Sequence, residues 1–161
     1  MTKLDEQGKI KKLQTNVKSA QSTYALAGVL ALIYMARYFI TGNFNFYFSS
    51  YIIEFLLKIS APEITVNPLI SANTAYILIG VYIAVYVLSG VVMLKFNKLL
   101  ALCLGIYAVD FILLIAGTAS GIFGSFSEDI FIDIIVHIFV TAFLAVGTYS
   151  AFRLSKTKTA E

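Results

Sequence analysis

The stretch EDIFIDIIVHIFVTAFLAVGTYSAF, residues 128–152, combines a long apolar run with ionisable side chains at a regular spacing. Asp129, Asp133 and His137 stand four residues apart, which places them on one face of a helix, and Thr141 and Thr148 continue that stripe. A bilayer crossing needs about 20 apolar residues. Because a charge at the bilayer centre costs at least about 2.5–3.5 kcal/mol, the stretch predicts a membrane-spanning helix that carries a candidate functional face.

The composition of the whole chain agrees with this interpretation. Of its 161 residues, 59% are hydrophobic and 13% are charged, and the mean hydropathy is +0.85. A soluble domain has about 25% charged residues. The composition predicts an integral membrane protein and gives little support to nucleic-acid binding. The length leaves room for a single domain, residues 1–161.

Four stretches are long and apolar enough to cross the bilayer: residues 24–40, 73–94, 99–118 and 130–152. Strands are not expected, since a membrane barrel needs at least about eight alternating segments. The fold class we predict is therefore all-α, an integral membrane four-helix bundle.

The basic residues predict its orientation. Ten of the twelve lysines and arginines fall in the leader (residues 1–22), between the second and third spans, or in the tail (residues 153–161). Lys and Arg in short flanking segments stay on the cytoplasmic side. We therefore expect a multi-pass plasma-membrane protein whose two termini are both cytoplasmic.

The basic leader has two interpretations. Ile10, Leu13 and Val17 recur at helical spacing among lysines, as in a helix that lies on anionic lipids. The alternative is a solvated basic tail. The leader does not have the form of a cleaved signal peptide, so we expect the first span to act as a retained anchor.

Residues 44–59 predict an amphipathic helix in the outer membrane interface, between the first and second spans. Its apolar side consists of Phe48, Ile52, Phe55 and Ile59. Its other side carries Ser50, Glu54 and Lys58, and the last two are spaced for an i,i+4 ion pair. The alternative is a packed loop that caps the bundle. In functional terms, this segment with Glu54, Lys58 and Asp129 would form a mouth or lid.

The ionisable residues of the spans share one half of the membrane. At about 1.5 Å per residue, Arg37 lies about one turn from the outer end of the first span, and Asp110 lies about 12 Å inside the third. On the fourth span, Asp129 is at the outer end, Asp133 about one turn inside, and His137 at a depth of about 10 Å. Charges in hydrocarbon need partners or a water-filled cavity, so these groups should converge.

This convergence has three interpretations. A binding or translocation site for protons or a small polar or cationic ligand would use Asp110 and Asp133 as acceptors, Arg37 as counter-charge and His137 as the titrating group. A structural cluster would only fix the packing of an accessory membrane subunit. An intramembrane hydrolase would use two aspartates that share a proton and activate water.

Several chemistries have no support in this sequence. Cys103 is the only cysteine, which excludes a Cys-x-x-Cys oxidoreductase. One histidine cannot ligate a bis-histidine haem, and with two carboxylates it specifies a metal only loosely. We therefore expect no cofactor and no metal. Four spans are few for a transporter, so a homo-oligomer or a larger membrane complex is expected as a partner.

Residues 109–112, Val-Asp-Phe-Ile, resemble an element of the lipoprotein signal peptidases, four-helix membrane proteins with two catalytic aspartates near the outer face. The resemblance implies that Asp110 is one catalytic aspartate and that Asp129 or Asp133 is the second. The Asn-x-x-Asp-Arg element of that family has no counterpart at residues 100–109. In layout alone, the chain is also similar to the four-helix DoxX-like membrane proteins.

Overall fold

The computed structural model describes residues 3–41, 50–60, 69–123 and 127–157, and these residues are almost entirely helical. The elements are α1 (Lys3–Thr41), α2 (Tyr51–Ser60), α3 (Ala72–Met93), the 3-10 helix η1 (Asn97–Leu99), α4 (Leu100–Ala119) and α5 (Glu128–Thr157). Four of them, α1, α3, α4 and α5, are long and apolar enough to cross a membrane. The predicted all-α fold, with four spans and a short helix between the first two, is confirmed.

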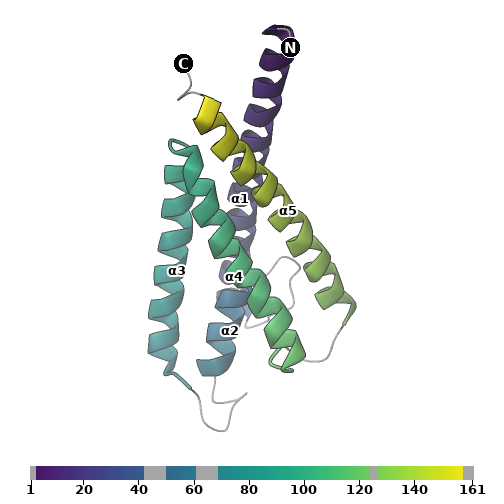
Figure 1. Cartoon of the computed structure of the whole chain (residues 1–161). Coiled ribbons are helices and arrows are strands. Elements are labelled where there is room, and N and C mark those ends of the chain that lie inside the picture. The colour runs from purple at the N-terminus through teal and green to yellow at the C-terminus, as the bar shows by residue number, and fades with distance from the viewer. Residues whose placement is uncertain (1–2, 42–49, 61–68, 124–126, 158–161) are drawn as a thin grey trace.

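The two ends of the assembly differ (Figure 1). The first turns of α1, the last turns of α5 and the α3–α4 connection lie together at one end, here called the termini end. The described residues of α2 and the start of α5 lie toward the other, here called the α2 end. The three basic groups of the sequence therefore share the termini end.

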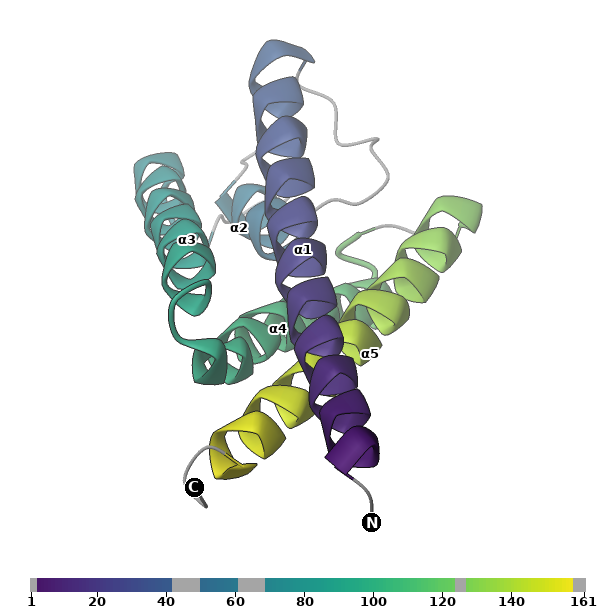
Figure 2. The same ribbon diagram turned by 90° about the horizontal axis from the view of Figure 1, so that it is seen from above.

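Helix α1 runs without a break through the leader and the first span. Its 39 residues make it about 58 Å long, more than a bilayer core requires. It crosses α5 near its middle (Figure 2). At this crossing Ala20 is fully buried, and the Asn16 amide donates to the Ser150 hydroxyl at 3.1 Å. The second half of the leader thus packs against α5.

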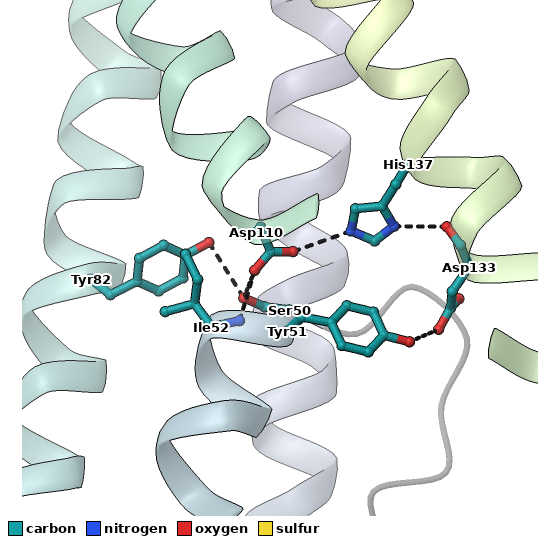
Figure 3. Close-up of polar contacts among 7 residues, drawn as sticks. All are labelled: Ser50, Tyr51, Ile52, Tyr82, Asp110, Asp133 and His137. Carbon is teal, nitrogen blue, oxygen red and sulfur yellow. Dashed lines mark hydrogen bonds and ion pairs between the residues drawn. The ribbon is translucent and has the colours of Figure 1, made fainter. Parts of the chain in front are cut away.

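Helix α2 packs against α3 and α4, and its first residues lie deeper in the assembly than its last (Figures 1 and 3). Its buried residues are Tyr51, Ile53, Glu54, Leu57 and Ser60, and Ser50 before it is also buried. The side that carries Ser50 and Glu54 therefore faces protein. Ile52, Phe55 and Ile59 are only half buried. Residues 44–49 of the predicted helix, including Phe48, lie outside the described residues.

The apolar core has an uneven distribution. The largest cluster lies toward the termini end, where Tyr24, Met93, Leu100, Cys103 and Leu144 come from four long helices. Two smaller clusters hold α2, one against α1 and α3 and the other against α4 and α5. The outward faces of the long helices are apolar, as expected for contact with lipid. Between these clusters lies a polar network.

Candidate functional site

Asp110 of α4 lies at the centre of the polar network (Figure 3). Its Oδ1 accepts from the backbone N–H of Ile52 at 2.8 Å and from the Ser50 hydroxyl at 3.0 Å. Its side chain therefore caps the N-terminus of α2 from a different helix, where the positive end of the helix dipole favours an anion. The Ser50 hydroxyl also lies 3.3 Å from the Tyr82 hydroxyl. Although Asp110 is buried, its Oδ1 therefore has two polar partners at the start of α2.

His137 of α5 binds the second oxygen of this carboxylate. Its Nε2 lies 3.2 Å from Asp110 Oδ2, and its Nδ1 lies 2.8 Å from the backbone carbonyl oxygen of Asp133. A carbonyl oxygen can only accept, so the hydrogen-bond network places a proton on Nδ1. A second proton must lie between Nε2 and Oδ2, because two lone pairs would otherwise face each other. The pair therefore holds one acidic proton and has zero net charge, whichever atom carries that proton.

Aromatic rings surround the imidazole. Tyr107 and Phe111 stack on it, with ring centroids 5.1 and 5.7 Å away, and Tyr51 meets it edge-on at 5.6 Å. The electron-rich faces of such rings favour a positive charge above them. Since His137 is only 2% exposed, its environment is set by these rings and by Asp110 rather than by water.

Asp133, one turn before His137, has a different partner. Its Oδ2 accepts a hydrogen bond from the Tyr51 hydroxyl at 2.5 Å. In the described residues the side chain of Asp110 binds Ser50, Ile52 and His137, and that of Asp133 binds Tyr51. A two-aspartate hydrolase needs its carboxyl groups to share a proton directly, and the geometry pairs Asp110 with an imidazole instead.

A cavity of about 110 Å³ adjoins the Asp110–His137 pair. One wall is the apolar face of α1 around Ala27 and Leu30. The other walls carry Ser50 and three tyrosines, Tyr82, Tyr86 and Tyr107. A site for one water takes about 10–15 Å³ on this measure, so the cavity has room for several waters or a small organic ion.

A second polar cluster lies on α2, away from this cavity. The predicted i,i+4 pair is present: Lys58 Nζ lies 2.9 Å from Glu54 Oε1, and both side chains are largely buried. The Tyr34 hydroxyl of α1 donates to the other oxygen of Glu54 at 3.5 Å. Burial raises the pKa of Glu54, and the Lys58 ammonium opposes that rise.

The predicted site residues are only partly brought together. Asp110, Asp133 and His137 converge. Arg37 does not join their network among the described residues, because Tyr34, Met35 and Tyr38 form the inner face of α1 and Arg37 lies exposed beside it. The side-chain partner of Asp110 on α5 is the imidazole of His137.

The remaining polar residues of the fourth span are placed as follows. Asp129 is exposed in the first turn of α5, as expected of a residue at the end of a span. The hydroxyls of Thr141 and Thr148 are buried and have no hydrogen-bond partner within the described part of the chain. Within the described ranges of the chain, no group of three His, Cys, Asp or Glu side chains could hold a metal ion.

Four contributors to the site were not predicted as members: Ser50, Tyr51, the Ile52 backbone N–H and Tyr82. Ser50 carried one usable signal, since serine directly before an amphipathic run is typical of a helix N-cap. A backbone N–H has no sequence signature. Tyr51 and Tyr82 are indistinguishable by sequence from the other tyrosines of the chain, of which there are ten in total.

Comparisons of this chain with protein-family models, with curated proteins and with solved structures found no match. The functional argument therefore depends on the geometry of the site.

Proposed function

We propose that this multi-pass membrane protein binds a small organic cation in the cavity beside Asp110 and His137, in exchange for a proton. The observation that carries the proposal is the pair of contacts of His137, Nδ1 with the Asp133 carbonyl oxygen at 2.8 Å and Nε2 with Asp110 Oδ2 at 3.2 Å, from which we infer one proton between Nε2 and Oδ2. Removing this proton leaves one negative charge on the pair. A monovalent cation in the adjoining cavity would neutralise that charge.

The cavity walls suit such a ligand. Tyr82, Tyr86 and Tyr107 present aromatic rings, which attract ammonium groups by about 0.5–2 kcal/mol each. The apolar face of α1 suits methyl or methylene groups. An alkylammonium ion needs one carboxylate and aromatic contacts, and the cavity lining offers both. In the same proposal, transport of the bound cation across the membrane would follow its binding.

Orientation bears on where the ligand comes from. The basic residues at the termini end support a plasma-membrane protein with both termini in the cytoplasm. In that orientation α2 and the Asp110–His137 pair belong to the outer half of the membrane, and the ligand enters from outside.

A second candidate, a structural role for the network, has its own supporting observation. Asp110 takes part in three hydrogen bonds, with Ser50, Ile52 and His137, and so joins α2 to α4 and α5. Each such hydrogen bond contributes about 0.5–1.5 kcal/mol, or about 1.5–3 kcal/mol where one partner is charged, so together they would stabilise the packing of these helices. A binding site predicts a specific response to an organic cation, whereas a purely structural network predicts none.

The experiment uses tetramethylammonium chloride as probe, with the protein in nanodiscs and the melting temperature as readout. We expect tetramethylammonium to raise the melting temperature more than sodium chloride of equal concentration. Because binding displaces a proton, its affinity should rise with pH, by up to about tenfold per pH unit. Asp110→Asn should stay folded, since its amide oxygen still accepts from Ile52 and its NH₂ group can donate to neutral His137 Nε2. This variant should lose the tetramethylammonium shift.

Asp129→Asn is the matched control, because it removes an exposed carboxylate from the same half of the protein. It should keep the full shift. A wild-type protein that responds equally to both salts contradicts the proposal, and so does an Asp110→Asn variant that keeps the shift. If tetramethylammonium has no specific effect and Asp110→Asn lowers the melting temperature strongly, the structural role stands instead.

A further inference from the structure

A groove at the termini end is separate from the cavity described above. Beyond their crossing, the N-terminal part of α1 and the C-terminal part of α5 diverge (Figure 2). The space between them measures about 490 Å³. It is lined on the α1 side by Lys9, Lys12, Ile10 and Leu13, and on the α5 side by Arg153 and Lys156.

The charge of the groove favours an anion. Lys9, Lys12, Arg153 and Lys156 are all exposed, and the acidic side chain in the lining is Glu6, which leaves a net charge of +3. The four cations come from two helices that are about 140 residues apart in the sequence. Only the α1–α5 crossing brings them to one site. An arginine opposite lysines is well suited to phosphate, because its planar guanidinium can donate two parallel hydrogen bonds.

Apolar surface accompanies the charge. Ile10 and Leu13 are half buried among the lysines, and Tyr149 and Phe152, one turn or less before Arg153, are exposed. The Arg153 guanidinium lies 5.9 Å from the Tyr149 ring centroid. A ligand that matches the groove therefore carries an anionic head and an apolar body.

The height of the basic residues along α1 and α5 also indicates that the ligand is a lipid. Residues 138–152 of α5 contain no Asp, Glu, Lys, Arg or His and cover about 22 Å, so Arg153 is the first charge at the membrane boundary on this side. On α1 the uncharged run is residues 19–36, about 27 Å, and Lys12 lies about 9 Å beyond Lys18 at its end. These heights correspond to the headgroup layer and the water beside it.

We infer that the groove between the ends of α1 and α5 binds the phosphate headgroup of an anionic phospholipid from the adjacent leaflet. Each wall of the groove supplies two of the four cations, so neither wall alone forms the whole binding site. A bound lipid would hold the two helix ends together. The inference concerns a different site from the proposed cation cavity and does not depend on it.

The test measures lipid affinity in detergent micelles, by thermal shift and by native mass spectrometry, with phosphatidylglycerol and phosphatidylcholine of equal chain length. We expect phosphatidylglycerol to stabilise the wild-type protein more than phosphatidylcholine. The double variant Arg153→Gln/Lys156→Gln should lower phosphatidylglycerol affinity by about 30-fold, because each basic residue near a membrane contributes about one factor of five. Both side chains are exposed, so the melting temperature without lipid should change little.

The matched control is Lys95→Gln/Lys98→Gln. It removes two exposed positive charges from the termini end but outside the groove, and it should keep wild-type affinity. Lys9→Gln/Lys12→Gln, on the opposite wall, replaces the α5 variant if that one does not fold. Equal losses in control and groove variants would mean a diffuse charge effect and would overturn the inference. So would equal stabilisation by the two lipids, or equal stabilisation by free glycerol phosphate.

Discussion

At the scale of single residues, His137 is the side chain on which the site depends. Both ring nitrogens have partners, and three aromatic rings surround the imidazole. A charged group in hydrocarbon costs at least about 2.5–3.5 kcal/mol when it is isolated. His137 and Asp110 avoid this cost as a neutral pair that contains one proton. The arrangement is stable without ligand and still leaves that proton available for exchange.

Glu54 offers a pH-dependent prediction at the same scale. Its folded-state pKa is raised by burial, and Lys58 limits the rise. A carboxyl group with a raised pKa stabilises the fold below its unfolded pKa, about 4.3, and this stability is lost as the pH rises through the folded pKa. Lys58→Met removes the limiting charge, so we expect a loss of about 3 kcal/mol at pH 8 and a much smaller loss at pH 4. Melting temperatures at the two pH values measure it.

The double variant Glu54→Gln/Lys58→Met is the control for this prediction. Without a carboxylate at position 54, the stability difference from wild type should no longer increase with pH. If Lys58→Met loses the same stability at both pH values, the effect comes from lost packing of the lysine side chain against Phe123 and not from charge.

At the scale of elements, α2 explains how an intramembrane carboxylate is accommodated. The helix has only ten residues, too few to span, and its N-terminus points at Asp110. The unpaired N–H groups of that terminus provide donors and a partial positive charge. A helix that lay on the membrane surface could not place these N–H donors and this partial charge beside a buried carboxylate. The same contact makes α2 sensitive to the site, because a ligand that draws Asp110 away also uncaps α2.

The crossing of α1 and α5 is the other element-scale feature, and it depends on Gly147. A Cβ atom at this position would lie 2.1 Å from the Ala20 Cβ, so the two helices are in direct contact. We expect Gly147→Ala to destabilise the protein by about 1–3 kcal/mol, because the backbones must separate. Denaturation in sodium dodecyl sulfate measures the free energy of unfolding.

Gly105→Ala is the matched control, since a Cβ atom there meets nothing within 4 Å. It should be neutral or slightly stabilising, as alanine favours a helix over glycine. Equal effects of the two substitutions would mean that the crossing tolerates a wider separation than the packing of Gly147 on Ala20 implies.

At the scale of the whole molecule, the polar network and the basic groups lie at opposite ends. The termini end has a packed apolar core and a basic rim, and the buried polar network lies nearer the α2 end. Such asymmetry suits a protein with one orientation in the membrane.

Labelling tests this orientation. Cys103 is fully buried, so a membrane-impermeant maleimide should not reach it in the folded protein. In intact cells we expect Asp129→Cys to be labelled and Lys95→Cys to be labelled only after permeabilisation, because these exposed positions lie at opposite ends. The reverse pattern would invert the topology and place the cation cavity in the cytoplasmic half.

The sequence predicted a large part of the fold and the ionisable side chains of the polar network, but not their other hydrogen-bond partners. Four apolar runs and one amphipathic segment gave the helices, because hydrophobicity and periodicity act locally. The i,i+4 spacing placed Asp133 and His137 on one face, and depth arithmetic brought Asp110 level with them. The role of Arg37 as their counter-charge stays a prediction, and the structure places Arg37 on the exposed side of α1. Depth fixes the height of a residue, but not the rotation of its helix about its axis.

By itself, then, the sequence determined that the chain is a four-span helical membrane protein with ionisable groups in one half of its spans. Only the tertiary structure decided which of those groups meet. The imidazole that contacts Asp110 is 27 residues away on α5, and the two donors to Asp110, Ser50 and the Ile52 N–H, lie about 60 residues away before and on α2. Such contacts follow from how each helix is rotated and packed, and packing depends on all the helices at once.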